Sequence, residues 1–310
     1  MKKKSYLVIV LFLLITSLGT SNRAWGAPPL MDFEGVGGGG ILPGAYLVNP
    51  PQEGQWVGKP AITQWSAIGG GSDLLTQGFA FTLFNRLEVG YMFEHFDCSR
   101  IRDDLRDESI RSAALGLKEM DGGEDTIYMH VFHIKALLFK ESKLFPAFAI
   151  GAEFKFNDTI DDINKNLGGA LSTIGYDTDH GVDFDISISK TIPKFVPYPL
   201  MIHSNIRFTK AVQTGLLGFS DDYKPNFEIG FDIIPQPNFM LGFEYRMKPD
   251  EYSSMASVLK DFTFKEDDLW DIHFGYLFDK HLSLALAFAS YGNVANQDVN
   301  YFVANIKYDF

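Results

Sequence analysis

The sequence predicts a transmembrane β-barrel of about twelve antiparallel strands, and three observations support this. The chain begins with a secretory signal, polar and apolar residues alternate from Ala61 onward, and the last alternating stretch ends on Phe310. Aromatic residues make up 15% of the 310 residues, and 28 of them are Phe. So many evenly spread Phe residues are typical of strands that face lipid.

The first 26 residues have the features of a signal peptide. Lys2, Lys3 and Lys4 precede an apolar run of about 13 residues, which is shorter than the roughly 20 residues of a spanning helix. Cleavage is expected before Ala27. It removes these three lysines and Arg23, turning 27 basic and 39 acidic residues into 23 and 39, a formal charge of −16. This charge argues against nucleic acid as a partner.

Residues 27–60 form a Gly- and Pro-rich segment that precedes the barrel, which is predicted to span residues 61–310. The run Gly35–Gly40 and the apolar stretch 41–48 lie within it. A phosphate-binding loop is one reading of the glycines, but no Lys-Ser or Lys-Thr follows and no helix pattern opens. A short strand or a piece tucked into the lumen, where it would act as a plug, is the alternative.

Twelve stretches from Ala61 onward alternate with a period of two. The predicted strands are 61–69, 77–84, 86–96, 127–139, 145–156, 182–191, 199–210, 225–234, 238–247, 267–278, 281–291 and 300–310. The connections between them alternate between short and long, as in outer-membrane barrels with short periplasmic turns and long external loops. With an even strand count, both termini are expected in the periplasm.

The polar phase of each strand is predicted to face the lumen and the apolar phase to face lipid. A soluble β-sandwich would bury the apolar phase instead, but twelve strands enclose a space too wide for an apolar side-chain core. The predicted lumen-lining charged residues are Glu88, Glu94, Lys135, Glu153, Lys155, Asp183, Asp185, His203, Arg207, Glu228, Asp232, Glu244, Arg246, Asp271, His273 and Lys307. They either pair across strands and stiffen the wall or select solutes in a pore.

A second charged group is expected where strands meet long loops on the external side. Together with Glu244 and Arg246, this predicted rim cluster comprises Lys210, Lys248, Asp250, Asp267 and Asp268. Our hypothesis is that the cluster orders the loops 211–224 and 248–266. Loop 97–126, which begins beside the single cysteine Cys98, is expected to be a charged loop or to contain a short helix.

The final strand carries a terminal aromatic pattern. Phe302, Ala304, Ile306, Tyr308 and Phe310 share one face, which resembles the signal read by the outer-membrane assembly machinery. The expected location is therefore the cell outer membrane. The expected partners are its lipid and lipopolysaccharide, the assembly machinery and, if the lumen is open, a small hydrophilic solute.

No catalytic, cofactor or metal site is predicted. Ser204 follows His203 but points to the opposite face of a strand, whereas Ser187 and Ser189 share the inner face with His203. A lumenal Ser–His contact therefore stays open beside a plain polar lining. His130 and His133 lie three apart on a strand, on opposite faces, and so do not pair as metal ligands.

Several segments resemble an uncharacterised proteobacterial family known as a domain of unknown function. They are the run from Glu34 to Gly40, residues 207–211 and 215–219, residues 242–250, and residues 266–268 with Asp271, as well as 85–88 and 280–284. The motifs Leu-Leu-Gly-Phe and Glu-Tyr-Arg-x-Lys-Pro-Asp carry most of the similarity. The resemblance implies an outer-membrane barrel and a family with no assigned activity.

Three functions follow from this sequence. The first is a narrow channel for small hydrophilic solutes. The second is a non-conducting barrel, plugged by residues 27–60 or by loop 97–126, with a structural or surface-binding role. The third is a lipid-modifying enzyme, which is disfavoured because no lipid-facing nucleophile and base stand together.

Overall fold

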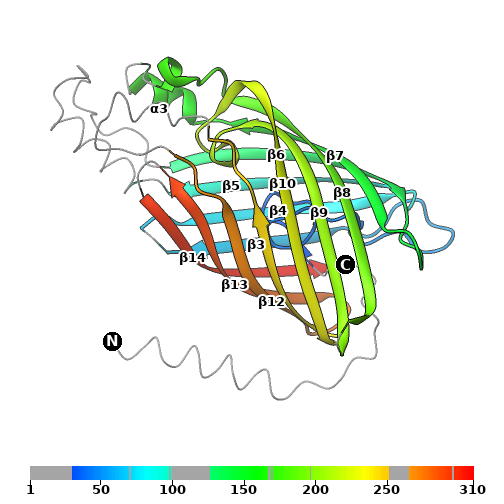
Figure 1. Ribbon diagram of the computed structural model, residues 1–310. Coiled ribbons are helices and arrows are strands. Elements are labelled where there is room, and N and C mark those ends of the chain that lie inside the picture. Colours follow the sequence, from blue (N-terminus) through cyan, green and yellow to red (C-terminus); the bar gives the residue numbers. More distant parts are fainter. Residues whose placement is uncertain are drawn as a thin grey trace, which may run out of the picture.

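The computed structural model describes residues 30–69, 71–97, 99, 126–166, 169, 171–195, 197–250, 265–294 and 297–310. Within them, twelve strands form one closed antiparallel barrel in which each strand pairs with its neighbours in sequence (Figure 1). The last strand closes the barrel by pairing with the first, from Phe302 opposite Ile68 to Asp309 opposite Ala61. The predicted twelve-stranded up-and-down barrel is confirmed.

The observed strands correspond one to one with the predicted ranges. They are β3 (Ala61–Ile68), β4 (Leu74–Leu83), β5 (Leu87–Asp97), β6 (Thr126–Phe139), β7 (Ala147–Asn157), β8 (His180–Phe195), β9 (Tyr198–Ala211), β10 (Phe219–Gln236), β11 (Phe239–Arg246), β12 (Leu269–Leu277), β13 (Leu282–Val294) and β14 (Gln297–Asp309). β8 and β10 are longer than predicted, with 16 and 18 residues. A membrane crossing needs only about 9–11 residues, so these strands project beyond it.

The connections alternate less regularly than the sequence predicted. Five short ones join β4 to β5, β6 to β7, β8 to β9, β10 to β11 and β12 to β13, and we call this end of the barrel the short-turn end. The opposite end carries the longer loops, but there β13 and β14 are separated by residues 295–296 alone. Both strands run further than the sequence indicated, so they use up residues assigned to a long loop. Most of loop 97–126, including Cys98, and the predicted signal peptide lie outside the described residues.

Short helices lie in two of the long loops. α3 (Ile160–Asn166) and the 3₁₀ turn η1 (Leu171–Ile174) follow β7, and a second 3₁₀ turn, η2 (Gln213–Gly215), joins β9 to β10. The Asn157 side chain accepts hydrogen bonds from the amides of Thr159 and Ile160, and so caps the start of α3. No helix among the described residues is long and apolar enough to span a membrane.

The two phases of each strand differ sharply in exposure. On β10, Phe227, Phe231 and Ile233 are 37–42% exposed, whereas Glu228 and Asp232 between them are fully buried. Large apolar side chains face outward on the other strands as well. Such an apolar outer wall with polar residues inside is the arrangement of a transmembrane barrel rather than a soluble sandwich.

Residues 30–48, which we call the lumen segment, lie inside the barrel (Figure 1, dark blue). Leu30–Met31 (β1) pairs with Gly37–Gly38 (β2) as a small two-stranded sheet, and nearly every residue of the segment is buried. The chain then leaves at the short-turn end, where the Gly58 amide donates to the Thr82 carbonyl at 2.7 Å. From there it enters β3 directly, so the segment is tethered to the end of the barrel where the strand starts.

Candidate functional site

The lumen is filled by the lumen segment and by side chains of the wall. All sixteen charged residues assigned to the lumen from sequence lie on the inner face, and none is more than 4% exposed. A water-filled pore would leave its lining residues in contact with solvent. The charges are therefore buried groups here, most of them in ion pairs, and the water-lined lumen inferred from the mixed-charge lining differs from the buried lining observed.

The centre of the site is Glu34, at the tip of the lumen segment. Its carboxylate forms ion pairs with Lys155, with Arg246 (Nη1, 2.7 Å) and with Arg207 (Nη2, 3.3 Å), and it is fully buried. Three strands, β7, β9 and β11, supply these cations. Buried charges need such multiple partners, because each one loses several kcal/mol of hydration.

The same three cations also pair with carboxylates of the wall. Arg207 contacts Glu228 and Glu153 at 2.8 Å each and Asp183 at 3.3 Å, and Lys155 lies 2.7 Å from Asp183. Without Glu34 the wall would hold three cations against three carboxylates. Glu34 thus adds a fourth carboxylate to these ion pairs, at the point where the lumen segment crosses the wall.

The ionisation of Glu34 follows from this setting. Burial raises the pKa of its carboxyl group. The nearby Arg246, Lys155 and Arg207 lower this pKa by more than burial raises it, and leave it well below the usual range. Glu34 is therefore charged throughout the physiological range.

The glycine run of the lumen segment binds carboxylates of the wall. The amides of Gly40 and Ile41 donate to Glu244 Oε2 at 2.9 and 2.7 Å, and those of Gly37 and Val48 donate to Glu88 at 2.8 and 2.6 Å. Exposed backbone N–H groups of a Gly-rich loop do form anion sites. Here the anions belong to the protein itself, so these amides are already occupied.

A side chain at Gly38 would clash with backbone, and one at Gly39 would displace the Glu244 carboxylate. A Cβ on Gly39 would lie 1.5 Å from Glu244 Oε1, and one on Gly38 would lie 2.3 Å from the Leu42 carbonyl oxygen. Both distances are far below any real Cβ contact. The glycine run thus allows the segment to fit against the wall.

Further contacts tie the backbone of the segment to other strands. Ser189 Oγ accepts from the Ala45 amide at 2.9 Å, Asn205 donates to the Pro43 carbonyl at 2.8 Å, and the Trp65 indole donates to the Met31 carbonyl at 2.9 Å. Lys135 Nζ donates to the Gly37 carbonyl at 2.6 Å. Side chains from β3, β6, β8 and β9 therefore join those of β5 and β11 in holding it.

The lumenal Ser–His contact left open by the sequence is present. Ser189 Oγ lies 3.0 Å from His203 Nδ1, and His203 Nε2 lies 3.1 Å from Asp232 Oδ2. All three side chains are fully buried, and the serine oxygen also receives the Ala45 amide. The arrangement anchors the lumen segment and offers no open side for a substrate.

An apolar cluster completes the packing inside the barrel. Phe33, Ile41 and Leu42 of the lumen segment belong to one buried cluster with Trp65 and Met92 of the wall. The Arg246 guanidinium lies 5.3 Å from the centre of the Phe33 ring. Polar and apolar contacts thus both contribute to holding the segment.

A second element closes the lumen towards the long-loop end. Residues 211–219, which we call the inward loop, are almost all buried, and Asn157 Nδ2 donates to the carbonyls of Gly215 and Leu216 at 2.8 and 3.0 Å. Gln213 and Thr214 adopt positive φ values of 49° and 60°. Such backbone strain in non-glycine residues persists only where surrounding contacts impose it.

Lys248 fixes this inward loop. Its Nζ donates to Gln213 Oε1 at 2.8 Å and to the Tyr291 carbonyl, and lies 4.6 Å from the Tyr291 ring centre. Burial lowers the pKa of Lys248 to about 8, although Glu266, Asp268 and Asp267 raise it. The predicted role of Lys248 in ordering the 211–224 loop has a structural counterpart in these contacts.

The predicted rim cluster forms one group only in part. Lys210 lies over the Tyr223 ring at 5.1 Å, Asp250 accepts from the Glu266 amide, Asp267 lies 3.9 Å from Lys265, and Asp268 accepts from the Lys248 amide. Arg246 instead points into the lumen and holds Glu34. Lys248, Asp267 and Asp268 lie together as grouped from sequence, whereas the strand phase of Arg246 turns it into the lumen.

The remaining residues predicted from sequence make few contacts or lie on the outer face. Lys307 pairs with Asp309 at 2.7 Å, Asp185 accepts from Ser187, and Glu94 is buried without a hydrogen-bond partner. His130 faces outward beside Tyr91, whereas His133 is buried 3.4 Å from Glu88, so the two lie on opposite faces as predicted. Phe302, Ile306, Tyr308 and Phe310 are all exposed on the outer face.

Sequence reasoning missed Glu34, Asn205 and the inward loop as parts of the site. The available signal was an acidic residue directly before a glycine run, in a segment otherwise nearly free of charge. The segments that carried the family resemblance include the tip of the lumen segment, the inward loop and the facing ends of β11 and β12. These segments contact one another through Glu34, Arg246, Lys248 and Gln213.

The closed barrel with its apolar outer wall defines a β-barrel membrane protein. Residues 27–303 match the family described as "Protein of unknown function (DUF3034)", so the chain belongs to this family. A comparison with curated proteins found no match.

Solved structures similar in fold include three outer-membrane proteins. They are Omp33 of Acinetobacter baumannii (10% identity, TM-score 0.42, 81% of this chain and 98% of that one), the KdgM porin (7%, 0.46, 81% and 99%) and the NanC porin (6%, 0.46, 81% and 100%). At these identities and scores the likeness concerns the barrel alone.

Proposed function

We propose that this protein is an outer-membrane barrel held closed by its own lumen segment, and that it does not conduct solutes in this state. The observation that carries the proposal is the burial of all sixteen charged lumen residues, none more than 4% exposed. Ion pairs to Glu34 and carboxylate contacts to the glycine run fix the segment in place. Of the functions considered from sequence, the plugged barrel therefore agrees best with the geometry.

A narrow channel for small hydrophilic solutes is the second candidate, reached by displacement of the lumen segment. The ion pairs within the wall favour it, because Lys155, Arg207 and Arg246 each keep a wall carboxylate as a partner when Glu34 is displaced. The same proposal includes export of the protein and its location in the outer membrane, in contact with lipid and lipopolysaccharide. It also includes recognition of the last strand, which ends at Phe310, by the assembly machinery. No catalytic step is proposed.

Thiol labelling tests the closed lumen. In a chain carrying Cys98→Ser, the substitution Ser189→Cys places a thiol beneath Ala45 of the lumen segment, where Ser189 is fully buried. We expect it to resist a charged, membrane-impermeant maleimide in the folded protein and to react once residues 30–48 are deleted. Gln52→Cys, at an exposed site outside the lumen, is the matched control and should react in both chains. Equal, rapid labelling of Ser189→Cys with and without the segment would contradict a closed lumen.

A further inference from the structure

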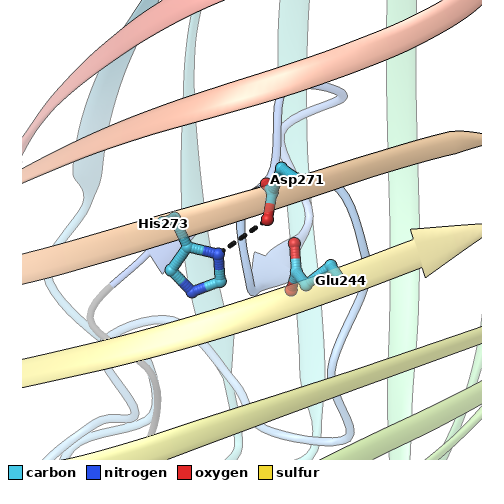
Figure 2. A group of neighbouring side chains, drawn as sticks. All are labelled: Glu244, Asp271 and His273. Atoms are coloured by element: carbon cyan, nitrogen blue, oxygen red, sulfur yellow. Dashed lines mark hydrogen bonds and ion pairs between the residues drawn. The ribbon is translucent and has the colours of Figure 1, made fainter.

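Three potential metal ligands meet at the contact between the wall and the glycine run. Glu244 lies on β11 directly opposite Asp271 on β12, and His273 lies two residues further along β12 (Figure 2). One ligand atom from each lies within 4.8 Å of the others. Their side chains point toward one another, and none of the three residues is more than 3% exposed.

The two carboxylates of this group, Glu244 and Asp271, have fewer positively charged partners than they would need to be neutralised. Among the described residues, neither Glu244 nor Asp271 forms an ion pair with a lysine or arginine, and Glu244 Oε1 is buried with no hydrogen-bond partner. An unpaired buried carboxylate oxygen is costly. By contrast, the similar group of Glu34, Glu153 and Asp183 already encloses the Lys155 ammonium and the Arg207 guanidinium.

His273 is oriented as a metal-binding histidine usually is. Its Nε2 lies 2.9 Å from Asp232 Oδ1, so this nitrogen can donate its proton to a carboxylate while Nδ1 faces Asp271 and Glu244. A second carboxylate that fixes the ring and its tautomer is the common companion of a metal-binding imidazole. Asp232 is itself held by His203 on its other oxygen.

Space for further ligands lies beside Asp271. A cavity of about 40 Å³ is lined by Asp271, Gly40, Ile41 and Trp65, together with apolar side chains of the wall. A single water occupies about 10–15 Å³ by the same kind of measure. The cavity therefore has room for a water beside Asp271, although neither Glu244 nor His273 lines it and most of its wall is apolar.

We propose that Glu244, Asp271 and His273 bind one divalent first-row transition-metal ion, with Zn²⁺ as the representative. One imidazole and two carboxylates match the ligand preference of such ions, and three protein ligands with water give a four-coordinate site. Binding releases the Nδ1 proton of His273 to solvent, and the two charges of the ion balance the two carboxylates. Since Glu244 also accepts the Gly40 and Ile41 amides, the ion lies where the lumen segment meets the wall.

Metal binding to the purified, folded barrel tests this directly. After removal of bound metal with a chelator, titration calorimetry with Zn²⁺ should give one site, and elemental analysis should find one zinc per chain. Asp271→Asn and His273→Gln should each weaken binding at least tenfold. His133→Gln is the matched control, because His133 is a similarly buried histidine of the lumen wall whose neighbouring carboxylate is Glu88, outside the ligand set, and it should change binding less than threefold.

Cobalt substitution gives a second, spectroscopic test that does not depend on measured binding affinities. Co²⁺ in the wild-type site should show visible d–d absorption, which His273→Gln abolishes while the barrel stays folded. Absence of a stoichiometric Zn²⁺ site in the wild type, or binding unchanged by both ligand substitutions, would overturn the proposal. Binding is measured whether or not the barrel conducts, so this result is separate from that of the closed-lumen test.

Discussion

Replacing Glu34 with alanine is expected to free the lumen segment from the wall. The substitution leaves Lys155, Arg207 and Arg246 short of a buried partner that each of them contacts. Removing one partner of a buried ion pair costs about 3–5 kcal/mol. Hydrogen exchange of the amides in residues 30–48 reports the effect, because Gly37, Gly40 and Ile41 donate to wall carboxylates. Their protection should fall by at least about a hundredfold.

The control for this substitution is Glu53→Ala. Glu53 is an exposed acid of the same N-terminal stretch, outside the lumen segment, and its removal should leave the protection unchanged. Unaltered protection in Glu34→Ala would show that the ion pairs do not hold the segment.

The contribution of Glu34 to holding the lumen segment depends on pH with a definite sign. The pKa of Glu34 is lowered in the folded protein, so its contribution is complete above the ordinary glutamate pKa of about 4.3. It is lost only as the pH falls below that value, through the depressed pKa. Between pH 5 and 8 the contribution of Glu34 to the protection should therefore be constant.

Arg246→Met is expected to have the second largest effect. Arg246 contacts Glu34 at 2.7 Å, donates to the Ile41 carbonyl, lies against the Phe33 ring and pairs with Glu228 at 3.0 Å. Methionine keeps much of the apolar contact to Phe33 but removes the charge and both polar contacts to the segment, those to Glu34 and to the Ile41 carbonyl. Loss of these buried pairs costs several kcal/mol. Under proteinase K, the half-life of the lumen segment in purified protein should fall at least tenfold.

Lys307→Met is the matched control for Arg246→Met. Lys307 is an equally buried cation of the lumen wall, but its ion pair is with Asp309 near the short-turn end. The same loss of charge there should leave the lumen segment as resistant as in the wild type. Equal cleavage in both variants would mean that general weakening of the wall, rather than the contact to Glu34, releases the segment.

The barrel could be predicted from sequence because each strand carries its own signal. Alternation along 225–234 and 267–278 separates a lipid face from an inner face without reference to any other strand. Strand ends were less certain, as β10 shows. Its first residues include Asp221 and Asp222, which break the apolar phase, yet Phe219 still pairs with Ala211 of β9. Backbone pairing outside the membrane needs no apolar face.

The contents of the lumen could not be predicted in the same way. The inner face of each strand was identified correctly, but whether water or protein fills the space depends on a segment with no periodic pattern. The contact between Glu34 and Arg246 joins residues 212 positions apart. Glycines that fit against wall carboxylates look in sequence like any flexible stretch, so only the three-dimensional arrangement assigns their partners.

Ion conductance in planar lipid bilayers tests the central claim most directly. The full-length protein is predicted to insert as a folded barrel without sustained conductance, whereas the chain lacking residues 30–48 should give steady single-channel currents. The Glu34→Ala and Arg246→Met variants, which keep the whole chain, should show intermediate, fluctuating openings. A full-length protein that conducts as well as the shortened chain would contradict the closed barrel.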